Sequence, residues 1–356
     1  MQMRSRPDKR IMRPRRGVGG AVAVAVAVLT VAAFVALLIV ASNLIADDRL
    51  SPTPRPTLQG VTDARNVSNP QQTDAQIKPV QHSSSFTKPL AAGSAVLLDD
   101  TGKVLYSMDS GERRYPASTT KVLTALLALE YGAMDDVIKV GDEANLPKPG
   151  SSSAGLRYGE KLTLNDLLHA LLIPSGNDAA YVIAAYTGRK IGGDDRMDYH
   201  EAVRLFVERM NSRAKELGAT HSRFMNPDGF HEEEHYTTAW DMALIARQAM
   251  THDSFRQVVA TGQYALPDIK IKDENGKSAT RHRVLQNTNE LIDSSSPCFL
   301  DSCTGVKTGH TSQSGYCLIS AAECQGRSVL AVVMGSTQEG IWRDSSSLLQ
   351  WGLSQR

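Results

Sequence analysis

The sequence lacks an excess of basic side chains outside its first 16 residues. Residues 1–16 hold seven Lys or Arg and one acid, a net charge of +6, whereas the other 340 residues hold 32 basic and 37 acidic side chains. Proteins that bind nucleic acid carry a basic patch or stripe. The charge balance of the body of the chain therefore gives no support to a nucleic-acid partner.

Charge is missing altogether from residues 17–46. A helix of about 20 apolar residues spans a bilayer, whereas the apolar region of a cleaved signal peptide has roughly 7–15 residues. A buried core helix is a third interpretation, but this run is apolar on every face. Because basic flanks stay in the cytoplasm, we expect a cytoplasmic tip at 1–16 and a transmembrane signal anchor at 17–46. Val40-Ala41-Ser42 fits a cleavage site and keeps a secreted form open.

Cysteine is scarce, with four residues at 298, 303, 317 and 324. Their spacing, C-x4-C and then C-x6-C, is not a usual zinc pattern. All four lie in the part expected outside the cytoplasm, where disulfides persist. A bridge between Cys298 and Cys303 and four free thiols both remain open.

Residues 47–88 lack an apolar period and are rich in Pro, Ser, Thr, Gln, Asn and Asp. This composition is typical of a flexible linker. Residues 89–356 are expected to form one folded domain, with no apparent internal repeat.

The domain also lacks the alternation of strands and helices that gives a parallel sheet. Strand patterns occur at 94–100 and 103–110 and again at 303–310, 314–323 and 327–336. Between them, helical periodicity is found at 162–173, 177–188, 200–218 and 237–250, and a closing helix is expected at 340–353. This segregation predicts an α+β fold with an antiparallel sheet, in which the N-terminal strands join the C-terminal ones.

The stretch YPASTTK, residues 115–121, places Ser118 and Lys121 three residues apart near the start of a helix predicted from about Thr119. Such residues share one helix face. A serine becomes a good nucleophile when a base takes its proton, and a lysine serves as that base if burial lowers its pKa. Taken alone, a helix-capping serine beside an unrelated lysine is the better interpretation, because caps favour serine.

Two later stretches change that balance. Ser175-Gly176-Asn177 stands just before a predicted helix, and Lys307-Thr308-Gly309 lies within a predicted strand. Each has a plain alternative, a helix cap in the first case and an ordinary strand lysine with a turn in the second. However, S-x-x-K, S-x-N and K-T-G occur together in the order and local settings typical of β-lactamases and penicillin-binding proteins.

With these motifs the chain resembles the serine-type D-alanyl-D-alanine carboxypeptidases, the low-molecular-mass penicillin-binding proteins, over residues 88–355. Further segments similar to that family are residues 147–168, 210–230, 235–250 and 314–323. The resemblance implies a β-lactamase/transpeptidase-like fold, in which a helical subdomain packs on an antiparallel β-sheet flanked by helices. Only 47 residues follow Gly309, so we expect no β-rich second domain, and the N-terminal helix would attach the protein to the bacterial cell membrane.

The resemblance also implies an activity and roles for the first two motifs. The enzyme would remove the C-terminal D-alanine from peptidoglycan pentapeptides through an acyl-enzyme on Ser118, and β-lactams would acylate the same residue. Lys121 would take the Ser118 proton, Ser175 would relay a proton to the leaving amine, and Asn177 would position Lys121 and the substrate amide. The chemistry needs no cofactor and no metal.

The third motif is implied to bind the substrate. Lys307 would attract the terminal carboxylate and oppose protonation of Lys121, and Thr308 would hydrogen-bond that carboxylate. Gly309 belongs to the same binding segment. The backbone N–H groups of Ser118 and His310 would form the oxyanion hole. The loop Gly150–Gly155 is expected beside the site.

Four rival functions are compatible with parts of the sequence. HEEEH, residues 231–235, fits the H-E-x-x-H zinc signature, but NPDGF before it is turn chemistry and the helix signal begins near Thr238. We therefore expect a solvated loop there. A class A-like β-lactamase would need a Glu-x-x-Leu-Asn loop, which is not found after residue 177. An endopeptidase acting on cross-links and a non-catalytic penicillin- or peptidoglycan-binding module remain as alternatives.

Overall fold

The structure is a computed structural model that describes residues 86–272 and 277–355. The predicted cytoplasmic tip, the anchor at 17–46 and most of the predicted linker lie outside these residues. Within them, no helix combines the length and the apolar content needed to cross a bilayer. Phe86, inside the segment predicted as linker, is already packed against Tyr106 and Trp351.

One antiparallel sheet unites strands from both ends of the domain, in the order β2-β1-β9-β8-β7. Its strands are β1 (Ser94–Asp99), β2 (Val104–Met108), β7 (Cys303–Thr311), β8 (Gly315–Cys324) and β9 (Arg327–Ser336). Strand β1 pairs with β9, with Val96 opposite Val332. The expectation that the N-terminal strands join the C-terminal ones is confirmed, and β7 lies at one edge of the sheet.

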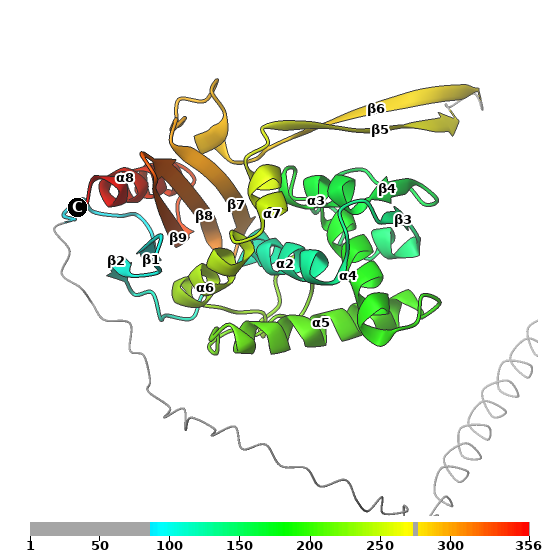
Figure 1. Ribbon diagram of the computed structural model, residues 1–356, viewed down its shortest axis with the longest axis horizontal. Coiled ribbons are helices and arrows are strands. Elements are labelled where there is room, and N and C mark those ends of the chain that lie inside the picture. The colour runs from blue at the N-terminus through cyan, green and yellow to red at the C-terminus, as the bar shows by residue number, and fades with distance from the viewer. Residues whose placement is uncertain (1–85, 273–276, 356) are drawn as a thin grey trace, which may run out of the picture. The chain divides into compact units, whose positions relative to one another are not determined.

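Helices cover both faces of this sheet. Helix α8 (Gly340–Ser354) packs on one face and α6 (Ala239–Ala249) on the other (Figure 1). Successive side chains of a strand point to opposite faces. Ala95 and Leu97 accordingly join the apolar cluster under α8, whereas Val96 and Leu98 join the larger cluster on the helical side. The uninterrupted apolar run of β1 follows from burial on both faces.

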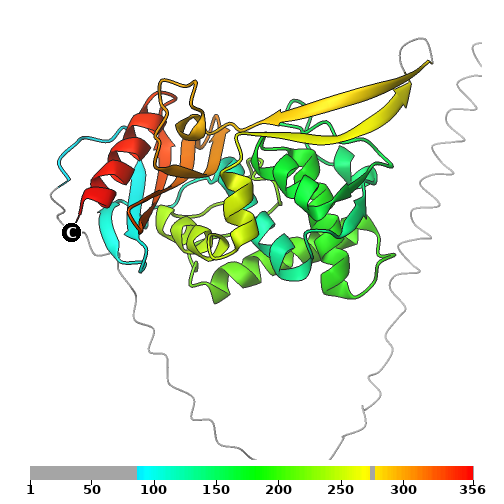
Figure 2. The same ribbon diagram turned by 45° about the horizontal axis from the view of Figure 1, so that its top comes forward.

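The helical subdomain stands beside the sheet (Figure 2). Its elements are η1 (Ala117–Thr120), α2 (Lys121–Tyr131), η2 (Asp142–Asn145), α3 (Leu164–Leu172), α4 (Asn177–Gly192), α5 (Tyr199–Glu216) and α7 (Asp253–Val259), with the short strands β3 (Val137–Lys139) and β4 (Lys161–Thr163). Helix α2 is central, since every residue from Lys121 to Ala128 is buried. It contacts α3, α4, α5 and α6, so its first turn is held firmly.

A long hairpin was not predicted from the sequence. Strand β5 (Gln263–Lys272) follows α7, and β6 (Ser278–Gln286) pairs with it. The two strands extend over the helical subdomain (Figure 1). Arg283 of β6 fixes the hairpin there through a buried ion pair with Glu160, with 2.7 Å between Nη2 and Oε2. The chain then passes through η3 (Glu290–Ile292) into β7.

The four cysteines are all unpaired. Of the two patterns left open by the sequence, the structure has the four free thiols. Cys303 and Cys317 are the more deeply buried, and burial raises the pKa of each thiol to about 11. Both are therefore protonated and unreactive at neutral pH.

Candidate active site

Ser118 and Lys121 meet at the junction of two helices. The chain forms a 3-10 turn from Ala117 to Thr120, and the α-helix begins only at Lys121, slightly later than the predicted start near Thr119. The capping interpretation of Ser118 is wrong, because Pro116 occupies the cap position and no side chain caps the turn. Lys121 Nζ lies 2.9 Å from Ser118 Oγ.

The Lys121 amine has three hydrogen-bond partners. Besides Ser118 Oγ, it lies 2.7 Å from Asn177 Oδ1 and 2.6 Å from the carbonyl oxygen of Asp228. The last two are acceptors only. A neutral amine donates its two N–H groups to them and turns its lone pair to the Ser118 hydroxyl. This geometry suits removal of the Ser118 proton.

Burial favours the neutral amine. Lys121 has no exposed surface, and desolvation lowers its pKa to about 8, although the charges of Asp228 and Asp178 oppose the shift. The pKa of Lys307 is held well below its ordinary value, first by burial and then by the charge of Lys121. From the sequence we expected the positive charge of Lys307 to oppose protonation of Lys121. In the structure, burial is the main cause of the lowered pKa of Lys121.

The second motif approaches from the start of α4. Gly176 is the cap residue and no side chain caps this helix, so the capping interpretation of Ser175 and Asn177 is also wrong. The Asn177 N–H donates to the carbonyl of Ser152 at 2.9 Å, while its side chain faces Lys121. Ser175 adopts a left-handed φ of 65°, and its buried hydroxyl has no partner among the described residues.

The third motif lies on edge strand β7. A Cβ on Gly309 would stand 3.1 Å from the Ser118 nitrogen and 3.0 Å from the Pro116 oxygen, so only glycine lets the strand approach the nucleophile this closely. Lys307 is 1% exposed and donates to the Thr308 carbonyl at 3.0 Å. Such burial excludes an ordinary solvent-facing strand lysine.

These elements border a cavity of about 290 Å³. Its lining residues are Ser118, Ser152, Ser175, Thr288, Thr308, Gly309, His310, Tyr316, Cys317, Ile341 and Trp342. Lys121, Asn177 and Lys307 do not line it and lie buried behind it. All eight predicted site residues are thus gathered at one cavity or directly behind it, and Ser152 places the predicted loop beside it.

Comparison with known proteins bears on this geometry. The sequence profile described as D-alanyl-D-alanine carboxypeptidase, peptidase S11, matches residues 80–338. The chain belongs to this family of serine peptidases. It is 37% identical over 250 residues to D-alanyl-D-alanine carboxypeptidase DacF of Bacillus subtilis, a match that covers 69% of this chain and 58% of DacF.

A second relative is similar over nearly its whole length. The D-alanyl-D-alanine carboxypeptidase of Streptomyces sp. K15 is 32% identical over 279 residues, 76% of this chain and 90% of the relative. The crystal structure named Streptomyces K15 DD-transpeptidase matches with a TM-score of 0.66 at 31% identity, covering 76% of this chain and all of that one. The predicted α+β transpeptidase-like fold is therefore confirmed for the described domain.

Within this member of the peptidase S11 family, sequence reasoning missed several residues around the site. Asp178, next to Asn177, accepts hydrogen bonds from Ser153 Oγ and from the backbone N–H groups of Ala154 and Leu156. It thereby holds the loop that carries Ser152. A short acidic residue in the first turn of a helix is so common that the sequence gave no signal for this role.

Asp228 and Thr288 were missed for other reasons. Asp228 was attributed to turn chemistry alone, yet its carbonyl is a partner of Lys121. Thr288 lies in the connection after β6, and its hydroxyl is 2.5 Å from that of Thr308. Thr288 follows directly after β6, which ends at Gln286. Because the β5–β6 hairpin was not predicted, the position of Thr288 at the cavity could not be predicted either.

The HEEEH segment does not form a zinc-binding helix. Helix α6 begins at Ala239, after the cap Thr238, so His231 and His235 both precede it as predicted. The expectation of a fully solvated loop is wrong for His235, which is 2% exposed and lies 3.0 Å from Thr120 Oγ1. Among residues 86–272 and 277–355, no group of three His, Cys, Asp or Glu side chains could hold a metal.

Treatment with a zinc chelator is therefore expected to leave the activity of the purified enzyme unchanged. We expect this because the S-x-x-K motif predicts Ser118 as the nucleophile and Lys121 as its base, rather than a metal-bound water. D-alanine release before and after dialysis against the chelator measures this. Activity that is lost on chelation and returns with added zinc would contradict the account.

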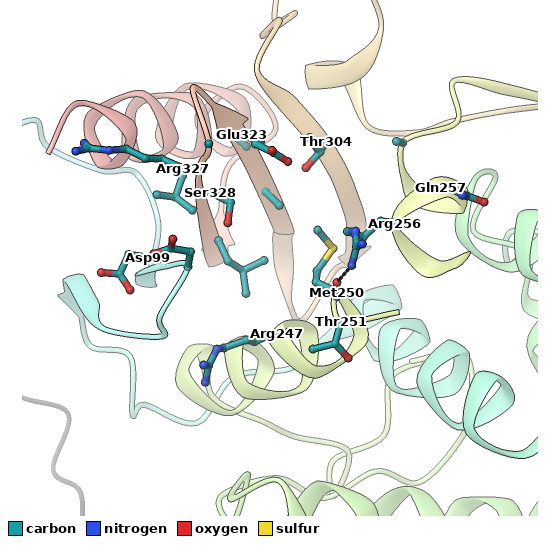
Figure 3. Close-up of a pocket in the computed structure, with 17 residues that line it drawn as sticks. Asp99, Arg247, Met250, Thr251, Arg256, Gln257, Thr304, Glu323, Arg327 and Ser328 are labelled. Atoms are coloured by element: carbon teal, nitrogen blue, oxygen red, sulfur yellow. Dashed lines mark hydrogen bonds between the residues drawn. The ribbon is translucent and has the colours of Figure 1, made fainter. Parts of the chain in front are cut away.

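A larger cavity of about 690 Å³ lies elsewhere, between helices α6 and α7 and strands β7, β8 and β9 (Figure 3). Its polar walls include Arg247, Arg256 and Glu323. Arg256 is occupied by the Met250 carbonyl, and Arg247 by that of Thr101. None of the predicted site residues lines this cavity, so its size does not locate the chemistry.

Proposed function

We propose that the protein is a D,D-carboxypeptidase that removes the terminal D-alanine from peptidoglycan peptides ending in D-Ala-D-Ala. The observation that carries the proposal is the buried Lys121 amine, 2.9 Å from Ser118 Oγ and fixed by Asn177 and Asp228. The relatives named D-alanyl-D-alanine carboxypeptidase support the same activity. The match covers 58% of DacF, and the proposal concerns the chemistry of this domain.

In acylation, Lys121 takes the Ser118 proton as Oγ attacks the carbonyl between the two D-alanines. The new Oγ–C bond replaces the peptide C–N bond, and the departing amine receives a proton through the Ser175 hydroxyl. That hydroxyl has no partner among the described residues, and Ser175 is one of the residues that line the cavity, which leaves the hydroxyl available for the relay. The free D-alanine then leaves.

Strand β7 supplies recognition. Thr308 and the nearby Thr288 offer hydroxyls to the terminal carboxylate of the substrate. Lys307, which is buried behind the cavity, provides a further hydrogen-bond donor. Gly309 closely approaches the Ser118 nitrogen, and we assign the oxyanion hole to the N–H groups of Ser118 and His310, the residue after Gly309. Donors arranged in this way stabilise the oxyanion of the tetrahedral intermediate.

Water completes the cycle by attacking the acyl carbon. The Oγ–C bond breaks, and the proton of the water returns to Ser118 by way of Lys121. A β-lactam enters by the same attack, but its amine stays attached to the acyl group. We expect the penicilloyl-enzyme to be long-lived, and rapid penicillin hydrolysis would favour the β-lactamase alternative instead.

The proposal extends to where the enzyme acts. Its substrate lies outside the cytoplasm, and the uncharged run at residues 17–46 with its basic flank would place a single-pass anchor in the bacterial cell membrane with the domain outside. A cleaved and secreted form is the alternative. Cell fractionation with an antibody against the domain distinguishes the two.

The test is D-alanine release from a pentapeptide ending in D-Ala-D-Ala, measured for the wild-type protein and for Ser118→Ala. We expect release by the first and none by the second. Cleavage of cross-linked dimers to monomers, without release of D-alanine from the pentapeptide, would favour endopeptidase action. Absence of both reactions, with the protein folded, would favour the binding-module alternative.

A further inference from the structure

Asp228 is a buried acid immediately behind the proposed base. Its backbone carbonyl lies 2.6 Å from Lys121 Nζ, and its side chain belongs to a residue that is 1% exposed. Oδ1 accepts one hydrogen bond, from the Phe230 N–H at 3.1 Å. Oδ2 is buried and has no partner among the described residues. A carboxylate in this state is incompletely compensated by hydrogen bonds.

The other acid near Lys121 is in a different state. Asp178 accepts bonds from Ser153, Ala154, Leu156 and its neighbour Ala179. Its charge is spread over four donors, and its function is to hold the loop at the cavity. Asp228 Oδ2 has no donor of this kind among the described residues, and the charge of Asp228 is the larger of the two that oppose the lowering of the Lys121 pKa.

We propose that the Asp228 carboxylate sets the protonation of the Lys121 amine and thereby the pH range in which Ser118 is activated. This rests on the proposed role of Lys121 as the base. A carboxylate nearby stabilises the ammonium that forms when Lys121 takes the Ser118 proton. The same attraction keeps more of the resting enzyme protonated, so the carboxylate strengthens the base while confining its action to higher pH.

Several other ionisable groups surround the pair. They are Asp178 and Tyr181 from α4, Lys307 from β7, and His231, Glu232 and His235 from the segment after Asp228. Burial lowers the pKa of His235 to about 3, so it stays neutral where Lys121 titrates. All of these groups are common to the wild type and the Asp228 variants described next.

The experiment compares the pH dependence of acylation by a fluorescent penicillin in the wild type and in Asp228→Asn. Asparagine keeps the backbone carbonyl and an oxygen for the Phe230 N–H, so only the charge is removed. We expect the acidic limb of the profile to move to lower pH by about one unit or more, and the plateau rate to fall because the base is weaker.

The matched control is Glu233→Gln, which removes an exposed carboxylate from the same segment. Because water screens that charge, its profile is expected to coincide with that of the wild type. Asp228→Ser, which also keeps an oxygen at the turn, repeats the measurement if Asp228→Asn unfolds. An unmoved limb in a folded Asp228 variant would overturn the inference, whether or not the plateau falls.

The outcomes separate this inference from the proposed function. If the folded wild-type protein is not acylated at any pH, the proposed function fails. If it is acylated with an acidic limb that the Asp228 substitutions leave in place, only the role of Asp228 fails.

Discussion

Replacing Lys121 with methionine is expected to lower the second-order rate constant for acylation of Ser118 by about 10²- to 10⁴-fold, the usual contribution of a general base. Methionine has nearly the length of lysine and no group that accepts a proton. Lys121 lies wholly buried among α2, α4 and the turn that holds Asp228, so no water replaces it without rearrangement. Stopped-flow or gel-based acylation with a fluorescent penicillin measures the loss.

The same substitution separates catalysis from stability. Burial of an ammonium is unfavourable, and its removal offsets the cost of leaving the buried Asn177 and Asp228 oxygens without a donor, so we expect the free energy of unfolding to change little. The matched control is Lys161→Met in β4, an exposed lysine away from the site, which should change neither quantity. Acylation of Lys121→Met at the wild-type rate would contradict the assignment of the base.

Replacing Arg283 with methionine is expected to lower the free energy of unfolding by about 3–5 kcal/mol, because Glu160 is left as an uncompensated buried charge. Both side chains are only 5% exposed, and Arg283 also donates to the Gly155 carbonyl at 3.1 Å. Replacing both partners by methionine should recover most of the loss. Urea denaturation followed by circular dichroism measures all three proteins.

A surface ion pair provides the comparison. Arg204 and Glu208 in α5 are 53% and 59% exposed, and Arg204→Met should cost about 1 kcal/mol or less. If Arg283→Met costs no more than this, or if the double variant is as unstable as the single one, the buried pair does not fix the hairpin.

Much of the fold was predictable from local patterns. The apolar runs of β1, β8 and β9 and the periodic helices each carry their own signal, and the lack of alternation between strands and helices forces an antiparallel sheet. The three motifs could be assigned to one site because each has a fixed spacing. Their order along the chain also matches that of a known family. That resemblance predicted that the three motifs lie together in the fold, which their spacing in the sequence does not show.

The β5–β6 hairpin was missed because its strands are mostly exposed and polar, and Pro267 interrupts the first of them. Its position depends on the long-range pair between Arg283 and Glu160, which no local pattern reports. The Asn-Gly dipeptide at 275–276 was the available signal, since it is typical of hairpin turns.

The source of the lowered pKa of Lys121 was also only partly predictable. Leucines at 123, 126 and 127 suggested an apolar setting, but complete burial follows from the packing of α2 among four other helices. The contact with the Asp228 carbonyl joins residues 107 positions apart. The Asn-Pro-Asp-Gly stretch predicts a turn, but it does not predict which residues the turn contacts.

Ser118 is the proposed nucleophile on which the whole mechanism depends. Incubation of the purified protein with penicillin, digestion with trypsin and tandem mass spectrometry test it most directly, because Ser118 falls in the short peptide of residues 115–121. We expect one penicilloyl group on Ser118 that persists through the digestion and is absent from Ser118→Ala. A folded protein that carries the adduct on another residue, or that carries none, would contradict it.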